Sequence, residues 1–128
     1  MIYEFCAENV TLLEKAIQAG ARRIELCDNL AVGGTTPSYG VTKAAVELAT
    51  NYDTTIMTMI RPRGGDFVYN DLEISIMLED IRLTAQAGSQ GVVFGALTAD
   101  KKLDKVNLEK LIAASKGMEI VFHMAFDE

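Results

Sequence analysis

Two thiols, Cys6 and Cys27, each lie at the end of a short, mostly apolar segment. Thiolate and thioether groups select Cu(I), and Met59 and His123 lie near the ends of later segments of the same kind. If the two cysteines occupy equivalent positions on adjacent parallel strands, a strand spacing of about 4.8 Å lets both bind one Cu(I) ion. The alternative is that both cysteines are small buried hydrophobes. The sequence contains no CxxC or MxCxxC metal loop.

A second set of side chains could bind and transform a small anion. Arg61 and Arg63 suit a carboxylate or phosphate group that accepts two parallel hydrogen bonds. If the protein is an enzyme, Glu25 and His123 are the candidates for proton transfer beside Arg61. The alternative is structural: Glu25 and Arg61 form an internal ion pair that fixes strand register, and His123 is a core histidine.

Two loops rich in glycine could surround such a ligand with backbone N–H groups. The candidate ligand-binding residues are Gly33, Gly34, Thr36 and Ser38 in the first loop and Arg61, Arg63, Gly64 and Asp66 in the second. Neither loop matches a P-loop or the GxGxxG pattern of dinucleotide-binding proteins. Each loop alone is therefore a weak indication, because most glycine-rich turns only reverse the chain.

Alternating strand and helix patterns must position these groups. We predict strands over 2–6, 23–27, 54–62, 91–97 and 118–126, and helices over 9–19, 41–52, 70–87 and 107–116. Asn70 and Glu73 are spaced as a capping box, and glycines follow several of the helices. The pattern predicts five parallel strands in sequential order, with the helices on one side, curved as an incomplete barrel.

Alternation along each strand assigns the chemical residues to one face. If Ile24, Leu26 and Phe122 pack against helices, the opposite face fills a lumen. That lumen is predicted to hold Glu4, Cys6, Glu25, Cys27, Met59, Arg61 and His123. Most of these residues come late in their strands, where α/β barrels place their sites. We therefore expect Glu25 and Arg61 within ion-pair reach at the C-terminal mouth, with His123 nearby.

Composition places this chain among single globular domains. It has 128 residues, 49% of them apolar, and a net charge of −6. An acidic chain without a basic cluster is a poor partner for nucleic acid or a membrane surface. Without a signal peptide pattern at the N-terminus, the expected location is cytoplasmic. A complete (β/α)8 barrel needs about 250 residues, so we expect residues 1–128 to be the N-terminal part of a longer barrel.

Four blocks of sequence resemble the copper homeostasis protein CutC family. They are Glu25-Leu26-Cys27 with residues 33–38, then residues 59–67, 91–97 and 122–127. The resemblance implies a TIM (β/α)8 barrel, here about four βα units and a fifth strand, in a cytoplasmic homo-oligomer that binds Cu(I). Gly95 and Asp127, inside these blocks, complete the candidate ligand-binding set. Met124 stands where the family commonly has arginine, which removes one cation from the expected site. A barrel enzyme acting on a small anionic metabolite is the alternative function.

Overall fold

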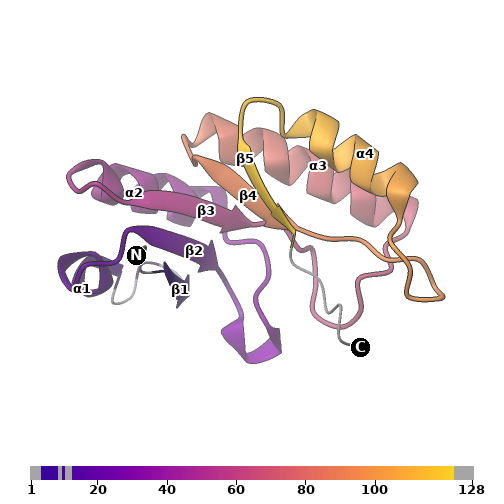
Figure 1. Ribbon diagram of the computed structural model, residues 1–128, viewed down its shortest axis with the longest axis horizontal. Helices are drawn as coiled ribbons and strands as arrows, with labels where there is room; N and C mark the ends of the chain where they lie inside the picture. Colours follow the sequence, from indigo (N-terminus) through magenta and orange to yellow (C-terminus); the bar gives the residue numbers. More distant parts are fainter. Residues whose placement is uncertain (1–3, 9, 11–12, 123–128) are drawn as a thin grey trace.

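A computed structural model describes residues 4–8, 10 and 13–122 of the chain. The strands are β1 (Glu4–Glu8), β2 (Arg23–Cys27), β3 (Thr55–Met59), β4 (Gly91–Phe94) and β5 (Glu119–Phe122). The helices are α1 (Leu13–Gln18), η1 (Leu30–Val32), α2 (Tyr39–Thr50), α3 (Asp71–Gln86) and α4 (Lys105–Ala114). All four strand pairs are parallel, and the sheet order is β1-β2-β3-β4-β5 (Figure 1). The predicted sequential sheet is confirmed.

The long helix α3 begins and ends where its sequence signals predict. The Asn70 side chain accepts a hydrogen bond from the Glu73 backbone N–H, and the Glu73 carboxylate accepts one from the Asn70 N–H. This reciprocal pair satisfies two N–H groups that the helix itself leaves without acceptors. Gly88 follows the helix with a φ of +95°, a conformation that glycine adopts without a steric penalty. Helix α4 starts earlier than predicted, because Asp104 rather than a later residue caps it.

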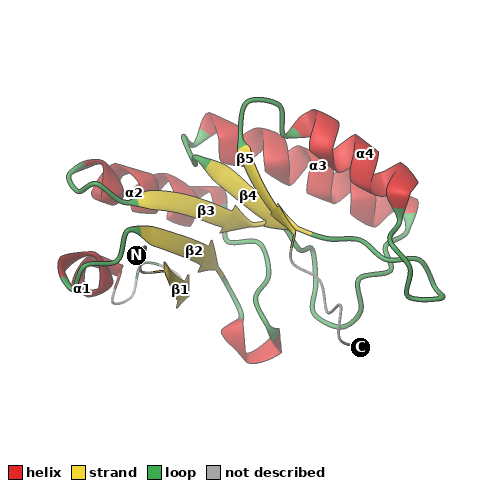
Figure 2. Ribbon diagram, in the orientation of Figure 1, coloured by secondary structure: helices red, strands yellow, loops and turns green. Residues whose placement is uncertain are grey.

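The outer face of the sheet forms the main core against the helices. Ile24, Leu26 and Ile56 pack with residues of α1 and α2, and Val92 and Phe94 pack with residues of α3 and α4. Figure 2 shows these helices gathered along one side of the sheet. None of the helices that the structure describes is long and apolar enough to cross a membrane. The prediction that Ile24 and Leu26 face the helices is confirmed, whereas Phe122 is 47% exposed and contacts the ring of Phe94.

The inner face carries its own small cluster of Cys27, Met57, Met59 and Val93, with Val121 packed against it. Across this face the Arg23 guanidinium on β2 reaches the Glu119 carboxylate on β5, with 2.9 Å between nitrogen and oxygen. Strands β3 and β4 lie between these two strands. Side chains three strands apart meet on this face because the sheet curves, as expected for part of a barrel.

Strands β3 and β4 end earlier than their sequences predict. Strand β3 stops at Met59, and β4 stops at Phe94. Backbone pairing continues briefly, because the Ile60 N–H donates to the Val93 carbonyl. Arg61 and the residues after it therefore belong to the loops at the C-terminal mouth of the sheet rather than to the strand.

Candidate functional site

Cys27 places a buried thiol on the inner face of the sheet. It is 2% exposed and packs with Met57 and Met59. Gly34 covers it: a Cβ at that position would lie 3.3 Å from Cys27 Sγ and 3.5 Å from Met59 Cε. Gly34 has a φ of +97°, so its conformation and its close approach both favour glycine. The Cys27 thiol and the Met59 side chain thus pack together beneath one loop.

Cys6 and Cys27 are not equivalent on their strands, so this expectation is wrong. Strand register places Cys6 opposite Glu25 and Cys27 opposite Glu8. The two cysteines are offset by two residues, or about 7 Å along the strand direction. The exposed Cys6 thiol approaches the Glu25 carboxylate, with 3.7 Å between Sγ and Oε2. The buried Cys27 thiol approaches the Ala7 carbonyl at 3.7 Å.

Both cysteine side chains are thiols rather than halves of a disulfide. Among residues 4–8, 10 and 13–122, no three His, Cys, Asp or Glu side chains gather into a cluster that could hold a metal ion. A thiol with thioethers is a different donor set, because sulfur ligands select soft ions such as Cu(I). Cys27 with Met59 and Met57 fits that chemistry.

The ionisation of Cys27 should make the stability of the metal-free protein depend on pH. Burial, followed by the charges of Cys6 and Glu8, raises the pKa of Cys27 from 9.0 to about 11. Between these values the unfolded chain has lost a proton that the folded chain keeps, so stability falls as pH rises. We expect a loss of about 2 kcal/mol between about pH 8 and about pH 11. Urea unfolding of the wild type and of Cys27→Ala measures it, and identical pH profiles in the two proteins would contradict the assignment.

Glu25 and Arg61 form no ion pair, so the predicted contact between them is wrong. Glu25 lies in the middle of β2, opposite Met57 on β3. Arg61 lies four residues beyond Met57, a span of about 13 Å in extended chain. The alternation of side chains predicts the shared face but not this axial separation.

Arg61 instead joins the two loops at the mouth. It is 5% exposed, and its Nη1 donates to the carbonyls of Val32 and Gly34 at 2.7 and 3.0 Å. Its Nη2 donates to the Gly65 carbonyl at 2.7 Å. The ring of Phe67 lies 4.8 Å from its guanidinium carbon, close enough for a cation–π interaction. Arg61 is thus enclosed by backbone carbonyls and an aromatic ring.

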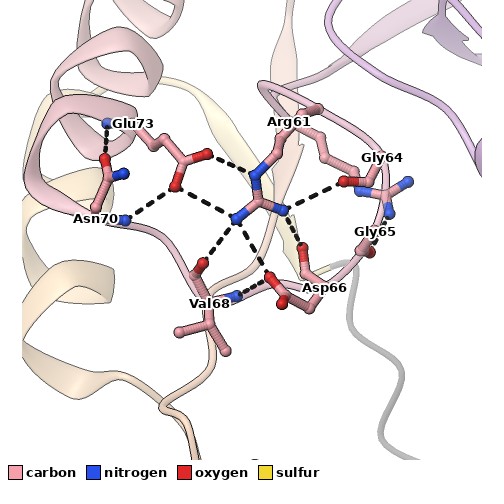
Figure 3. Close-up of polar contacts among 8 residues, drawn as sticks. Arg61, Gly64, Gly65, Asp66, Val68, Asn70 and Glu73 are labelled. Atoms are coloured by element: carbon pink, nitrogen blue, oxygen red, sulfur yellow. Dashed lines mark hydrogen bonds and ion pairs between the residues drawn. The ribbon is translucent and has the colours of Figure 1, made fainter.

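Arg63 organises the loop that leads into α3. Its Nε and Nη2 donate to the two carboxylate oxygens of Glu73 at 2.5 and 3.3 Å. Further bonds go to the carbonyls of Gly64, Asp66 and Val68. Figure 3 shows Glu73, Asp66 and Val68 arranged around one guanidinium group. The bond from Arg63 lowers the pKa of Glu73, which belongs to the capping box of α3. The N–H groups of Arg63 already donate to this loop and to Glu73. Ligand binding by Arg63 therefore stays a prediction.

The other candidate residues of the first loop shape the backbone. Ser38 caps α2 by accepting a hydrogen bond from the Val41 N–H. The Thr36 hydroxyl accepts from the Arg61 N–H at 2.8 Å and lies 3.1 Å from the Arg61 carbonyl. Gly33 has a φ of +90° and faces Arg61 Nη1. The first loop is therefore hydrogen-bonded to the segment that follows β3.

The remaining candidates fall in three places. Gly64 packs against Val32, and Asp66 forms an ion pair with Arg63 at 3.2 Å. Gly95 is buried directly after β4. His123 and Asp127 lie outside the described residues, so their placement in the site stays a prediction.

Tyr69 belongs to the same region and was missed by the sequence analysis. It is 7% exposed, and its ring lies 5.1 Å from the guanidinium carbon of Arg63. Its hydroxyl and Arg61 Nε are buried and have no hydrogen-bond partner among the residues that the structure describes. Burial raises the pKa of Tyr69, and the cations Arg61 and Arg63 oppose that rise. An aromatic residue in a polar loop after two arginines is the only signal the sequence offers for it.

Comparison with known proteins gives a consistent family. The model of the CutC family matches residues 1–128. CutC family proteins of Streptococcus pyogenes and Enterococcus faecalis are 57% and 54% identical, each over 99% of this chain and 61% of their own length. A Streptococcus agalactiae crystal structure named for copper homeostasis protein CutC superposes with a TM-score of 0.94 at 51% identity, covering 99% of this chain and 60% of that one. The chain thus spans about three-fifths of the length of these relatives.

Proposed function

This chain belongs to the CutC family, and on that premise we propose that it serves copper homeostasis by binding Cu(I) as cargo at the inner face of the sheet. The observation that carries the proposal is the meeting of Cys27 and Met59 beneath Gly34. A thiolate supplies charge and a thioether supplies a second soft donor, which together favour Cu(I) over harder ions. Met57 is the further thioether within reach of this cluster.

Cys6 has a secondary part in the proposal. It lies on β1 beside Glu25, while the thiol of Cys27 is buried deeper. An exposed thiol is suited to receive Cu(I) first, and a buried one to retain it. Zn(II) should bind less well, because it prefers four tetrahedral nitrogen or sulfur ligands.

The proposal places the protein in the cytoplasm and in a homo-oligomer. Thiols stay reduced in the cytosol, which keeps both cysteines available to the metal. Strands β1 and β5 form the two edges of the described sheet. The backbone N–H and C=O groups of an edge strand can pair with a strand of another chain, which is one route to an oligomer.

The alternative function, a barrel enzyme of unassigned reaction, receives less support. It requires Glu25 and Arg61 to act on one small anionic metabolite. The register separates them along the sheet, and Arg61 holds loop carbonyls. The copper proposal needs no contact between them.

An anaerobic titration with Cu(I) against a chromophoric competitor tests the copper proposal. We expect Cys27→Ser to lose the tightest site, and Met59→Leu to weaken it by about tenfold, since one of two or three soft ligands is removed. Cys6→Ser should slow uptake more than it lowers affinity. The measurement is the competitor's absorbance at each copper concentration, made on the full chain.

Met118→Leu is the matched control, because this methionine packs on the helix side of the sheet. It should leave the titration unchanged. Equal copper uptake by the wild type and by the protein with both cysteines changed to serine would refute the site.

A further inference from the structure

Within the part of the chain that the structure describes, the mouth of the sheet contains two buried polar groups that lack a hydrogen-bond partner. They are Nε of Arg61 and the hydroxyl of Tyr69. Buried polar groups are almost always paired, because leaving one without a partner costs free energy. Two such groups at one place therefore point to a hydrogen-bond acceptor that a bound ligand supplies.

The geometry of Arg61 shows which part of its guanidinium is already used. Both Nη atoms are occupied by the carbonyls of Val32, Gly34 and Gly65. No carboxylate forms an ion pair with Arg61 in the part of the chain that the structure describes. The cation is thus buried, held in a fixed orientation, and faces carbonyl oxygens and the ring of Phe67 rather than a carboxylate.

Tyr69 lies beside this cation. Burial raises the pKa of Tyr69, while the charge of Arg61 and a close contact between its guanidinium and the Tyr69 hydroxyl lower it. That contact does not have the geometry of a full hydrogen bond. The other nearby cation, Arg63, is neutralised by Glu73 and Asp66. The positive charge that remains at this point therefore comes from Arg61.

We propose that Arg61 Nε and the Tyr69 hydroxyl are the donors of an oxyanion site, which takes one oxygen of a carboxylate or phosphate group. The negative oxygen would accept from both donors and would compensate the buried guanidinium. The site lies at the C-terminal ends of the strands, where α/β barrels bind ligands. It is separate from the copper proposal, which uses the sulfur atoms of the inner face.

Tyr69→Phe is the variant that tests this site, because it removes one oxygen and keeps the ring under Arg63. In the ligand-free full chain this change removes an unsatisfied donor, so the Tm should rise by about 2–4 °C. Inorganic phosphate and acetate are then titrated separately at constant ionic strength while Tm is followed. We expect a saturable rise for at least one anion, and about tenfold weaker binding of that anion by Tyr69→Phe.

Tyr39→Phe is the matched control, because Tyr39 is 39% exposed and lies at the start of α2. It should bind each anion as the wild type does. A response to phosphate alone assigns the site to phosphate groups, and a response to acetate alone assigns it to carboxylates. The site is overturned if neither anion gives a saturable shift, if Tyr69→Phe binds as tightly as the wild type, or if it melts lower without ligand. The copper titration of Tyr69→Phe should match the wild type, which separates the two proposals.

Discussion

Gly91→Ala is expected to lower the free energy of unfolding by about 3 kcal/mol, at the upper end for overpacking a core. A Cβ on Gly91 would lie 2.5 Å from Met57 Sδ and 2.5 Å from the Glu119 carbonyl oxygen. Met57 can move its side chain, but the Glu119 carbonyl belongs to the backbone of β5, which pairs with β4 at this residue. The new methyl group must therefore displace a strand. Urea unfolding at neutral pH measures the change.

Gly40→Ala is the control for this prediction. Gly40 lies in the first turn of α2, and the nearest described atom to a Cβ there would be Ser38 Oγ, at 3.9 Å. Alanine has the better helix propensity, so we expect a gain of up to about 1 kcal/mol. Equal stabilities of the two alanine variants would show that β4 and β5 are not packed as described.

Arg61→Lys should cost about 3 kcal/mol of unfolding free energy, although the charge is conserved. The guanidinium holds carbonyls from two loops at once, and an ammonium group cannot reproduce that fork. Buried carbonyls left without a donor add their desolvation cost. Thermal and urea unfolding measure the loss, and amide hydrogen exchange should show faster opening of residues 32–36 and 64–67.

Arg82→Lys makes the same chemical change at an exposed site. Arg82 pairs with Glu79 on the surface of α3, where ion pairs contribute little. We expect its stability to stay within about 0.5 kcal/mol of the wild type. If Arg61→Lys were as mild, the connection between the loops would not depend on Arg61.

The strand order and the two faces of the sheet could be predicted from the sequence, because they depend on local patterns. Ile24 and Leu26 alternate with Glu25 and Cys27, and this period of two decides which side meets the helices. The Asn70–Glu73 capping box is similarly local, and it marks the start of α3.

Relations between strands could not be predicted in the same way. The register of two parallel strands depends on how whole βα units pack together, so the two-residue offset of Cys6 and Cys27 has no local signal. The same holds for Arg61, whose partners are backbone carbonyls. Any residue can supply a carbonyl, so no side-chain pattern identifies Val32, Gly34 and Gly65 as acceptors. Tyr69 became a candidate only when its burial was known.

The ion pair between Arg23 and Glu119 bears on the order in which the chain folds. Every strand pairs with its neighbour in sequence, so each βα unit can dock on the preceding one during synthesis. Arg23 and Glu119 are 96 positions apart, and their contact must wait until β5 is in place. We therefore expect the contact between Arg23 and Glu119 across the inner face to form late in folding.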